Sequence, residues 1–284
     1  MLRFFLKRCL AMIPVLFVVS VLAFAFVHLL PGDPARMMAG PDADVATIEA
    51  FRQQLGLDRP LPEQYVRYIG KLLVGDLGIS LRTKIAVFDE IALRYTPTMV
   101  LALCGMAWSV VFGVLFGAIA AIHSGKWQDY TAMLVSVSGI SVPQFWLGLL
   151  LIQLCAVYLG WFPVAGIANG WFSLILPGLV LAALSMAYVA RLTRTSMVET
   201  LGADHVRTAR SKGITELRVV TRHGLRNALI PVVTFIGADL GAMMGGAIVT
   251  ESVFNIPGIG RAVFDAVRNQ EGPVVVGIVT MMVF

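Results

Sequence analysis

Charged side chains are scarce in this sequence. Asp, Glu, Lys and Arg make up 14% of its 284 residues, whereas a soluble globular domain carries about 25%. Hydrophobic residues make up 58%, and the mean hydropathy is +0.82. This composition excludes an ordinary soluble domain and indicates a chain that lies mostly in lipid. The net charge of +5 then indicates basic loops on one side of a membrane rather than a nucleic-acid-binding surface.

Cysteine and histidine are also too few, and too poorly spaced, for a metal centre. The three cysteines, Cys9, Cys104 and Cys155, lie at or inside apolar stretches, which predicts buried thiols and no disulfide framework. None of the four histidines has the H-E-x-x-H spacing of a metalloprotease. The sequence therefore predicts no metal site.

The motifs of nucleotide binding and of serine hydrolysis are absent as well. A phosphate-binding loop needs Gly-Lys followed by Ser or Thr, but Leu72 follows Gly70-Lys71 and Trp127 follows Gly125-Lys126. A serine nucleophile needs G-x-S-x-G, but Val142 and Pro143 follow Ser141. We predict that the chain is not an enzyme, has no catalytic residues and binds no cofactor itself.

Long apolar segments are what the sequence does contain, and a helix of about 20 such residues crosses a bilayer. The first of these segments, Leu10–Leu30, follows Arg3, Lys7 and Arg8. It is longer than the apolar core of a signal peptide, so we interpret it as a retained span. The 13 residues Gly272–Phe284 make only about 20 Å of helix; they predict an incomplete sixth span, with an interfacial tail as the alternative, and a natural chain that continues. The five longer segments are Leu10–Leu30, Thr98–Ile122, Tyr130–Gly160, Leu174–Ala190 and Ala228–Val249.

The distribution of basic residues sets the predicted orientation, because Lys and Arg in short loops favour the cytoplasm. With the N-terminus inside, the opposite short loops carry only Arg261 and Arg268. We therefore predict a multi-pass protein of the inner membrane whose N-terminus is cytoplasmic. The basic residues on the cytoplasmic side are Arg3, Lys7, Arg8, Lys126, Arg191, Arg194, Arg207, Arg210, Lys212, Arg218, Arg222 and Arg226.

The first external segment, 31–97, has helical patterning of its own. Pro31-Gly32-Asp33-Pro34 is a turn signal. Apolar residues then recur at helical spacing in Val45–Leu55, Gln64–Leu73 and Val87–Leu93. We predict a small helical insertion on the outer face, with a spacer without function as the alternative.

The basic segment 191–227 is too long for a passive connection between spans. Ala203–Ser211 is predicted to form a short helix, with Ser196 and Glu199 at capping-box spacing before it. Gly213 is placed to end it. A small compact helix fits a groove on a cytoplasmic partner, and a basic stretch lying on anionic lipid is the alternative.

Within the spans, Asp239 is the acidic residue that stands out. An ionised side chain at the centre of a span costs about 2.5–3.5 kcal/mol, so such residues face a bundle interior or water. Asp239 is therefore a candidate for the translocation pathway, with a structural hydrogen bond as the alternative. Gly237, Gly241 and Gly245 form a stripe around it that favours close packing of helices.

Two interruptions of regular helix complete the candidate sites. Pro143 breaks the third span, and Ser136, Ser138 and Ser141 can satisfy the backbone groups that it frees. Pro143 and Ser141 thus belong to the candidate pathway, unless the break only shapes the bundle. The second interruption follows the fifth span, where the turn with Asn255, Pro257 and Gly258 is a candidate periplasmic gate or a plain external loop.

Several motifs together resemble one family of permeases. The run from His205 to Gly213, continued by His223–Pro231, resembles the EAA loop of bacterial binding-protein-dependent ABC importer permeases, and of the dipeptide/oligopeptide and glutathione-type branch in particular. Arg207 stands where that loop's Glu is expected. The likeness extends from the first span almost to the last residue, through Leu30–Arg36, Gln54–Asp58, Gly75–Ser80, Ser138–Pro143 and Val253–Gly260.

This resemblance implies a six-span permease that works with a homologous second permease, two ABC ATPases and a periplasmic substrate-binding protein. ATP and Mg²⁺ would bind the ATPases. The loop would form the coupling helix, with Ala209 and Gly213 giving close approach and Arg207, Arg210 and Lys212 making polar contacts. The implied substrates are dipeptides, oligopeptides or glutathione; nickel, opines or other small solutes are the alternatives on the same fold, and a secondary transporter is a further one.

Overall fold

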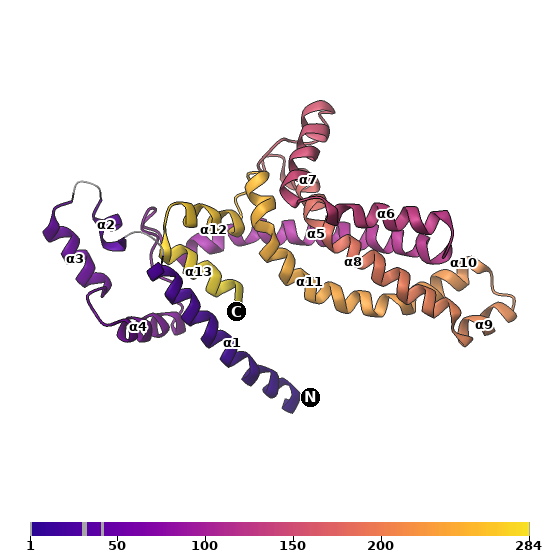
Figure 1. The fold of residues 1–284 in the computed structure, drawn as a ribbon, viewed down its shortest axis with the longest axis horizontal. Helices are drawn as coiled ribbons and strands as arrows, with labels where there is room; N and C mark the ends of the chain where they lie inside the picture. Colours follow the sequence, from indigo (N-terminus) through magenta and orange to yellow (C-terminus); the bar gives the residue numbers. More distant parts are fainter. Residues whose placement is uncertain (1, 30–32, 41–42, 284) are drawn as a thin grey trace. The chain divides into compact units, whose positions relative to one another are not determined.

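The structure is a computed structural model that describes residues 2–29, 33–40 and 43–283. Helices form nearly all of the regular structure in these residues, beside one isolated antiparallel bridge between Ile79 and Ala86. The chain forms two compact units, Met1–Thr96 with Ala262–Phe284, and Pro97–Arg261. This organisation confirms the all-helical prediction (Figure 1).

The first unit joins the two ends of the chain. Its helices α1 and α13 pack along each other, and α4 also contacts α1. The hydroxyl of Tyr65 lies 2.8 Å from that of Ser20 on α1, and the hydroxyl of Tyr68 lies 3.0 Å from that of Thr280 on α13. The helices of this unit are α1 (Leu2–Leu29), α2 (Pro34–Ala39), α3 (Val45–Leu55), α4 (Leu61–Leu73), the first turns of α5 (Val87–Ile122), most of α12 (Ile259–Arg268) and α13 (Gly272–Val283).

Local capping signals explain the short helices of this unit. The Asp33 carboxylate accepts a 3.0 Å hydrogen bond from the Ala35 N–H at the start of α2, and Asp44 accepts one of 3.1 Å from Thr47 at the start of α3. Gly56 has a φ of 71° after α3, a left-handed conformation that glycine adopts easily. The helix α3 has the predicted bounds, and α4 begins three residues before the predicted Gln64.

The second unit is a bundle in which α8 packs against α5, α6 and α11 (Figure 1). The chain bends by 106° between α6 and the helix that follows it. The elements are the rest of α5, α6 (Trp127–Ser141), α7 (Gln144–Leu151) with the π-helical η1 (Ile152–Tyr158), the 3-10 helix η2 (Gly170–Leu174), α8 (Ile175–Gly202), α9 (Asp204–Ser211), α10 (Glu216–Arg218), the π-helical η3 (Val219–Leu225), α11 (Arg226–Val253) and the start of α12 (Ile259–Arg268).

Among the residues that the structure describes, three helical segments are long and apolar enough to cross a membrane, and the bent pair Trp127–Ser141 with Gln144–Tyr158 can provide a fourth span. Leu10–Leu22 and Gly272–Met282 are shorter apolar helices. The three long segments are Val87–Ile122, Gly170–Gly202 and Glu216–Gly245. This confirms a multi-pass membrane chain, with three or four spans by length and composition.

Two expected boundaries are wrong. The separate stretches Val87–Leu93 and Thr98–Ile122 form one helix that continues through Pro97. The span expected to end at Ala190 continues to Gly202, so Ser196 and Glu199 lie inside α8 and do not cap α9. The polarity of the side chains changes at both places, but polarity alone does not interrupt backbone hydrogen bonding, so the helices continue past the expected ends.

The crossing of α5 and α8 depends on glycine. A Cβ at Gly113 would lie 2.7 Å from the Val189 side chain, and a Cβ at Gly117 would lie 2.5 Å from the carbonyl oxygen of Ala190. Real Cβ atoms do not approach other atoms so closely, so these two positions admit only glycine unless a helix shifts. Small residues at such contacts allow two helix backbones to pack directly.

Candidate functional site

The segment 203–218, which we call the α9–α10 tip, is a folded projection of the second unit. Val206 and Ala209 point inward from α9 and pack against Val219 of η3. Gly213 has a φ of 75° and donates a 2.9 Å hydrogen bond to the carbonyl of Arg210, which ends the helix as predicted. Ala209 is 6% exposed, so its small side chain lets α9 approach this chain's own η3.

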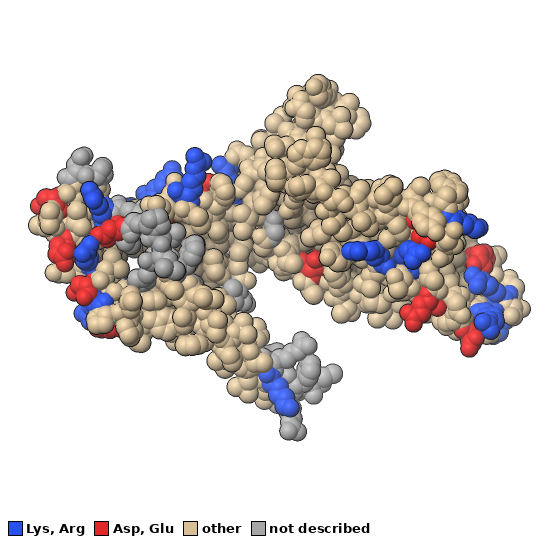
Figure 2. All heavy atoms as spheres, viewed as in Figure 1, with Lys and Arg blue, Asp and Glu red and all other residues tan. Residues whose placement is uncertain are grey.

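The outward side of the tip carries charge and one large apolar side chain. The guanidinium of Arg210 binds both carboxylate oxygens of Glu216 at 2.6 and 3.1 Å and so joins α9 to α10. The Arg207 side chain is 78% exposed, Lys212 is exposed, and Leu217 is 77% exposed. Basic and acidic residues gather over this end of the second unit in Figure 2. Leu217 was not singled out from the sequence, because its exposure depends on how α10 turns.

The tip is connected to the long helices of the bundle. Leu201 of α8 packs against the buried cluster under α9 and also against a second cluster that contains Met197 of α8 and Ala228 of α11. A Cβ at Gly224 of η3 would lie 2.8 Å from the Leu201 side chain. The α9–α10 tip is thus packed continuously against α8 and the start of α11.

An ion pair joins α6 to α8 toward the same end of the bundle. Arg194 donates two hydrogen bonds of 2.6 Å to the carboxylate of Asp129, and the N–H of Gly125 donates a third of 2.9 Å. The Asp129 side chain is only 4% exposed. This pair was not predicted, since 65 positions of the sequence separate its members.

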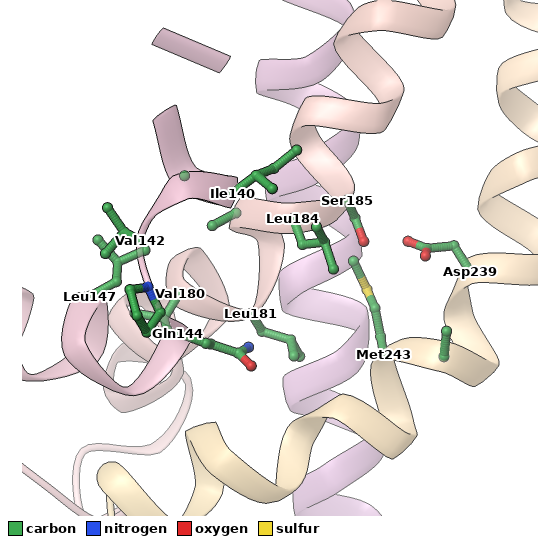
Figure 3. Close-up of a pocket in the computed structure, with 14 residues that line it drawn as sticks. Ile140, Val142, Gln144, Leu147, Val180, Leu181, Leu184, Ser185, Asp239 and Met243 are labelled. Carbon is green, nitrogen blue, oxygen red and sulfur yellow. The ribbon is translucent and has the colours of Figure 1, made fainter. Parts of the chain in front are cut away.

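A cavity of about 310 Å³ lies in the bundle between α6, α7, α8 and α11. Two of the predicted pathway residues line it, Asp239 and Pro143. Figure 3 shows the Asp239 carboxylate directed toward the hydroxyl of Ser185 on α8, with Met243 beside them. The break between α6 and α7 thus forms one wall of the cavity that contains the acidic residue.

The direction of Asp239 follows from its position on α11. Residues four apart lie on one face of a helix, and its neighbours at that spacing both face α8. The ring of Phe235 lies 5.9 Å from that of Tyr188 on α8, and Met243 is buried in one cluster with Leu181 of α8. Asp239 therefore faces α8 as well.

The glycine stripe lies on the other side of α11. Nothing in the described chain lies within 4 Å of a Cβ built at Gly237, Gly241 or Gly245. The close packing expected of this stripe does not occur within the described part of the chain, because α8 covers the opposite face of α11.

The predicted role of the serines is wrong for two of them. Ser136 and Ser138 donate to the carbonyls of Met133 and Val135, three residues back in α6, which are not the carbonyls that Pro143 frees. Ser141 is exposed and does not line the cavity. The bend is supported instead by Gln144, whose side-chain amide donates a 3.1 Å hydrogen bond to the hydroxyl of Thr250 on α11.

The predicted gate turn lies at the other end of α11 and is held by contacts with neighbouring segments. Asn255 has a φ of 55° and Gly258 is buried, while Pro257 is exposed. The N–H of Gly166 donates a 2.8 Å hydrogen bond to the carbonyl of Phe254 just before the turn. The carboxylate of Glu251, which is fully buried, packs against Gly258.

Glu251 was missed by sequence reasoning. It lies just beyond the apolar segment predicted as the fifth span, a position where an acidic residue is unremarkable. Its importance comes from its contacts with α5 and α12, which the sequence does not indicate.

Metal-ligating groups do not gather in the described residues. No cluster of three or more His, Cys, Asp or Glu side chains there could hold a metal ion, and Cys104 and Cys155 are free thiols. The features that the second unit does present are one carboxylate in a cavity, a break in a helix and a charged tip.

Comparison with known proteins covers almost the whole sequence. Residues 113–284 match the family described as binding-protein-dependent transport system inner membrane component, and residues 1–102 match the family of N-terminal segments of such membrane components. The chain is 52% identical to a glutathione transport system permease protein of Escherichia coli K12, over 97% of this chain and 90% of that relative. The same coverage holds for glutathione transport system permease proteins of Pectobacterium atrosepticum, at 52% identity, and of Shigella flexneri serotype 5b, at 51%.

Proposed function

This chain belongs to the family of binding-protein-dependent transport system inner membrane components, and from that premise we propose that it is the permease subunit of an ATP-driven importer for glutathione or other short peptides. The observation that carries the substrate class is identity of about half over 97% of the chain to permeases named for glutathione transport. A permease has no covalent step of its own; it provides a route through the membrane.

The proposed topology has six membrane segments. They are α1, α5, the bent pair of α6 with α7 and η1, α8, α11 and α13, with 31–97 as a periplasmic helical insertion. The excess of Lys and Arg in the first turns of α1, between α5 and α6 and from the C-terminal half of α8 to the start of α11 supports a cytoplasmic N-terminus. The α9–α10 tip is then cytoplasmic, and the turn Asn255–Gly260 is periplasmic.

The proposed partners follow from what the chain lacks and what its tip presents. The sequence has no phosphate-binding loop, so ATP and Mg²⁺ would be held by two ABC ATPase subunits. A periplasmic binding protein would deliver the substrate, and a homologous permease would supply the other half of the route. The exposed Arg207, Lys212 and Leu217 would contact an ATPase, while Ala209 and Gly213 keep α9 compact.

The proposed coupling runs through the bundle itself. The tip packs on η3 and on Leu201 of α8, and η3 leads directly into α11. The helices α8 and α11 also line the cavity with Asp239 and Pro143. Closure of the ATPases would move the tip, and α8 and α11 would transmit that movement to the cavity, with the turn at Asn255, Pro257 and Gly258 acting as the outer gate.

Co-purification and transport measured together test this proposal. When the tagged chain is expressed in its own host and purified from the membrane, two ATPase subunits and a second permease should be recovered with it. Vesicles that contain the reconstituted complex should accumulate labelled glutathione or tripeptides when ATP and the binding protein are present. The variants Arg207→Glu and Leu217→Asp should lower ATPase recovery by at least about tenfold, as expected of contacts central to an interface.

Lys71→Glu is the matched control, since Lys71 is exposed on α4 in the predicted external insertion. It should leave ATPase recovery unchanged. Accumulation of peptide by this chain alone in lipid vesicles would contradict the proposal, as would reaction of a cysteine placed at position 207 with an impermeant reagent added outside the cell.

A further inference from the structure

We propose that Asp239 and Arg191 form a two-point binding site for a zwitterionic short peptide along the facing sides of α8 and α11. In this site the carboxylate of Asp239 binds the peptide's ammonium group, and the guanidinium of Arg191 binds its terminal carboxylate. The inference rests on the proposed function, because it assigns a ligand to the same pathway.

The Asp239 carboxylate has no donor in the described part of the chain. It is half-buried on α11 and lines the cavity between α6, α7, α8 and α11. Among the described residues, none makes a hydrogen bond or ion pair with it; the Ser185 hydroxyl points toward it in Figure 3 without bonding it. A carboxylate inside a membrane bundle needs a counter-charge or water, and this one is open to a ligand that brings positive charge.

The size of the cavity limits what enters it. Its volume of about 310 Å³ is at the lower end for small-ligand pockets, which run from about 300 to 1,000 Å³. It therefore accommodates one end of a peptide, and the rest of the molecule must extend beyond it along the bundle.

A second hollow of about 330 Å³ lies farther toward α9 on the same two helices, α8 and α11. Tyr188 and Phe235 line it, and so does Arg191, whose guanidinium carbon lies 4.9 Å from the centre of the Tyr188 ring. The next arginine, Arg194, is held by Asp129. Of the carboxylates that the structure describes, none pairs with Arg191, so its charge is available to a ligand.

The rise of α8 between the two hollows matches a short peptide. The Asp239 carboxylate is directed toward Ser185 in Figure 3, and Arg191 follows Ser185 by six positions on α8, a rise of about 9 Å along a helix. An extended chain covers about 3.3–3.6 Å per residue. The site thus fits a dipeptide or tripeptide whose amino and carboxyl ends are both unblocked, with the aromatic rings beside its middle.

Saturation-transfer NMR on the purified complex tests this site without the binding protein, which would impose its own selection. The probes are trialanine, N-acetyl-trialanine and trialanine amide. Either blocked probe should give a signal at least about tenfold weaker than trialanine, the usual loss for a charge-assisted hydrogen bond. Asp239→Asn should abolish the difference between trialanine and its acetylated form, and Arg191→Gln the difference between trialanine and its amide.

The control variants separate binding from folding. Asp239→Glu should keep the preference for a free amino group, and Asp58→Asn, an exposed external carboxylate, should behave like the unchanged complex. Equal signals from all three probes in the unchanged complex would overturn the inference, as would an unchanged preference in Asp239→Asn. Peptide uptake and ATP hydrolysis by the unchanged complex test the proposed function separately, so either idea can fail alone.

Discussion

The hydroxyl of Thr98 donates a 2.6 Å hydrogen bond to the carboxylate of Glu251, and both side chains are buried. The same hydroxyl accepts a 2.8 Å bond from the N–H of Ile259, and the other carboxylate oxygen accepts a 2.9 Å bond from the N–H of Arg261. One threonine and one glutamate thus tie the end of α11 and the start of α12 to α5. The turn with Asn255, Pro257 and Gly258 lies between the two tied helices.

Removing the Thr98 hydroxyl should destabilise the protein. Thr98→Val keeps the shape but leaves a buried carboxylate oxygen short of a donor and a buried N–H without its acceptor. We expect a loss of about 2–4 kcal/mol in the free energy of unfolding, seen as a lower midpoint of thermal unfolding for the purified chain. Thr234→Val on α11 is the control, because that exposed hydroxyl bonds only its own helix. Equal midpoints for the two variants would refute the role of the Thr98–Glu251 contact.

A methyl group at position 258 should displace the Glu251 carboxylate. A Cβ there would overlap the carboxylate atoms, whereas a Cβ at Gly241 would meet nothing in the described chain. Gly258→Ala should therefore cost about 1–3 kcal/mol of stability, the usual effect of overpacking, and Gly241→Ala should be near neutral in the isolated chain. Combining Gly258→Ala with Thr98→Val should cost less than the sum of the two, since both act on one network. Additive losses in thermal unfolding would contradict this.

The Asp129–Arg194 pair should contribute more to stability than an exposed pair. A double-mutant cycle with Asp129→Asn and Arg194→Gln measures the interaction free energy directly. We expect about 1–3 kcal/mol, below the value for a fully buried pair because the Arg194 side chain is 32% exposed. The control cycle is Arg59 with Glu63 on either side of the start of α4, whose side chains are 42% and 44% exposed, where about 0.5 kcal/mol is expected. Similar values from the two cycles would show that burial of Asp129 adds nothing.

The α5–α8 crossing should tolerate no side chain at position 117. Gly117→Ala would place a Cβ 2.5 Å from the carbonyl oxygen of Ala190, so one helix must shift. We expect a loss of about 1–3 kcal/mol, measured as a lower thermal midpoint. Gly202→Ala at the end of α8 meets nothing within 4 Å and provides the comparison. A stable Gly117→Ala protein would show that the two helices are free to separate.

Much of the architecture could be predicted because its signals are local. Hydropathy over a run of residues marks an apolar helix wherever it lies, and capping at Asp44 and termination at Gly213 depend on residues within one turn. The predicted limits of two spans, next to Pro97 and at Ala190, were wrong for a related reason. The hydropathy pattern marks where the helix leaves the apolar environment, but the helix itself continues past that point.

The sequence by itself thus determined that this chain is helical, lies in a membrane and carries a short terminated helix in a basic segment. Only the tertiary structure decided which residues meet. It placed Asp239 beside Ser185, the glycine stripe away from α8, and Asp129 against Arg194. These pairings depend on how helices rotate and cross. That choice is made by packing between residues far apart in the chain, which local propensity does not encode.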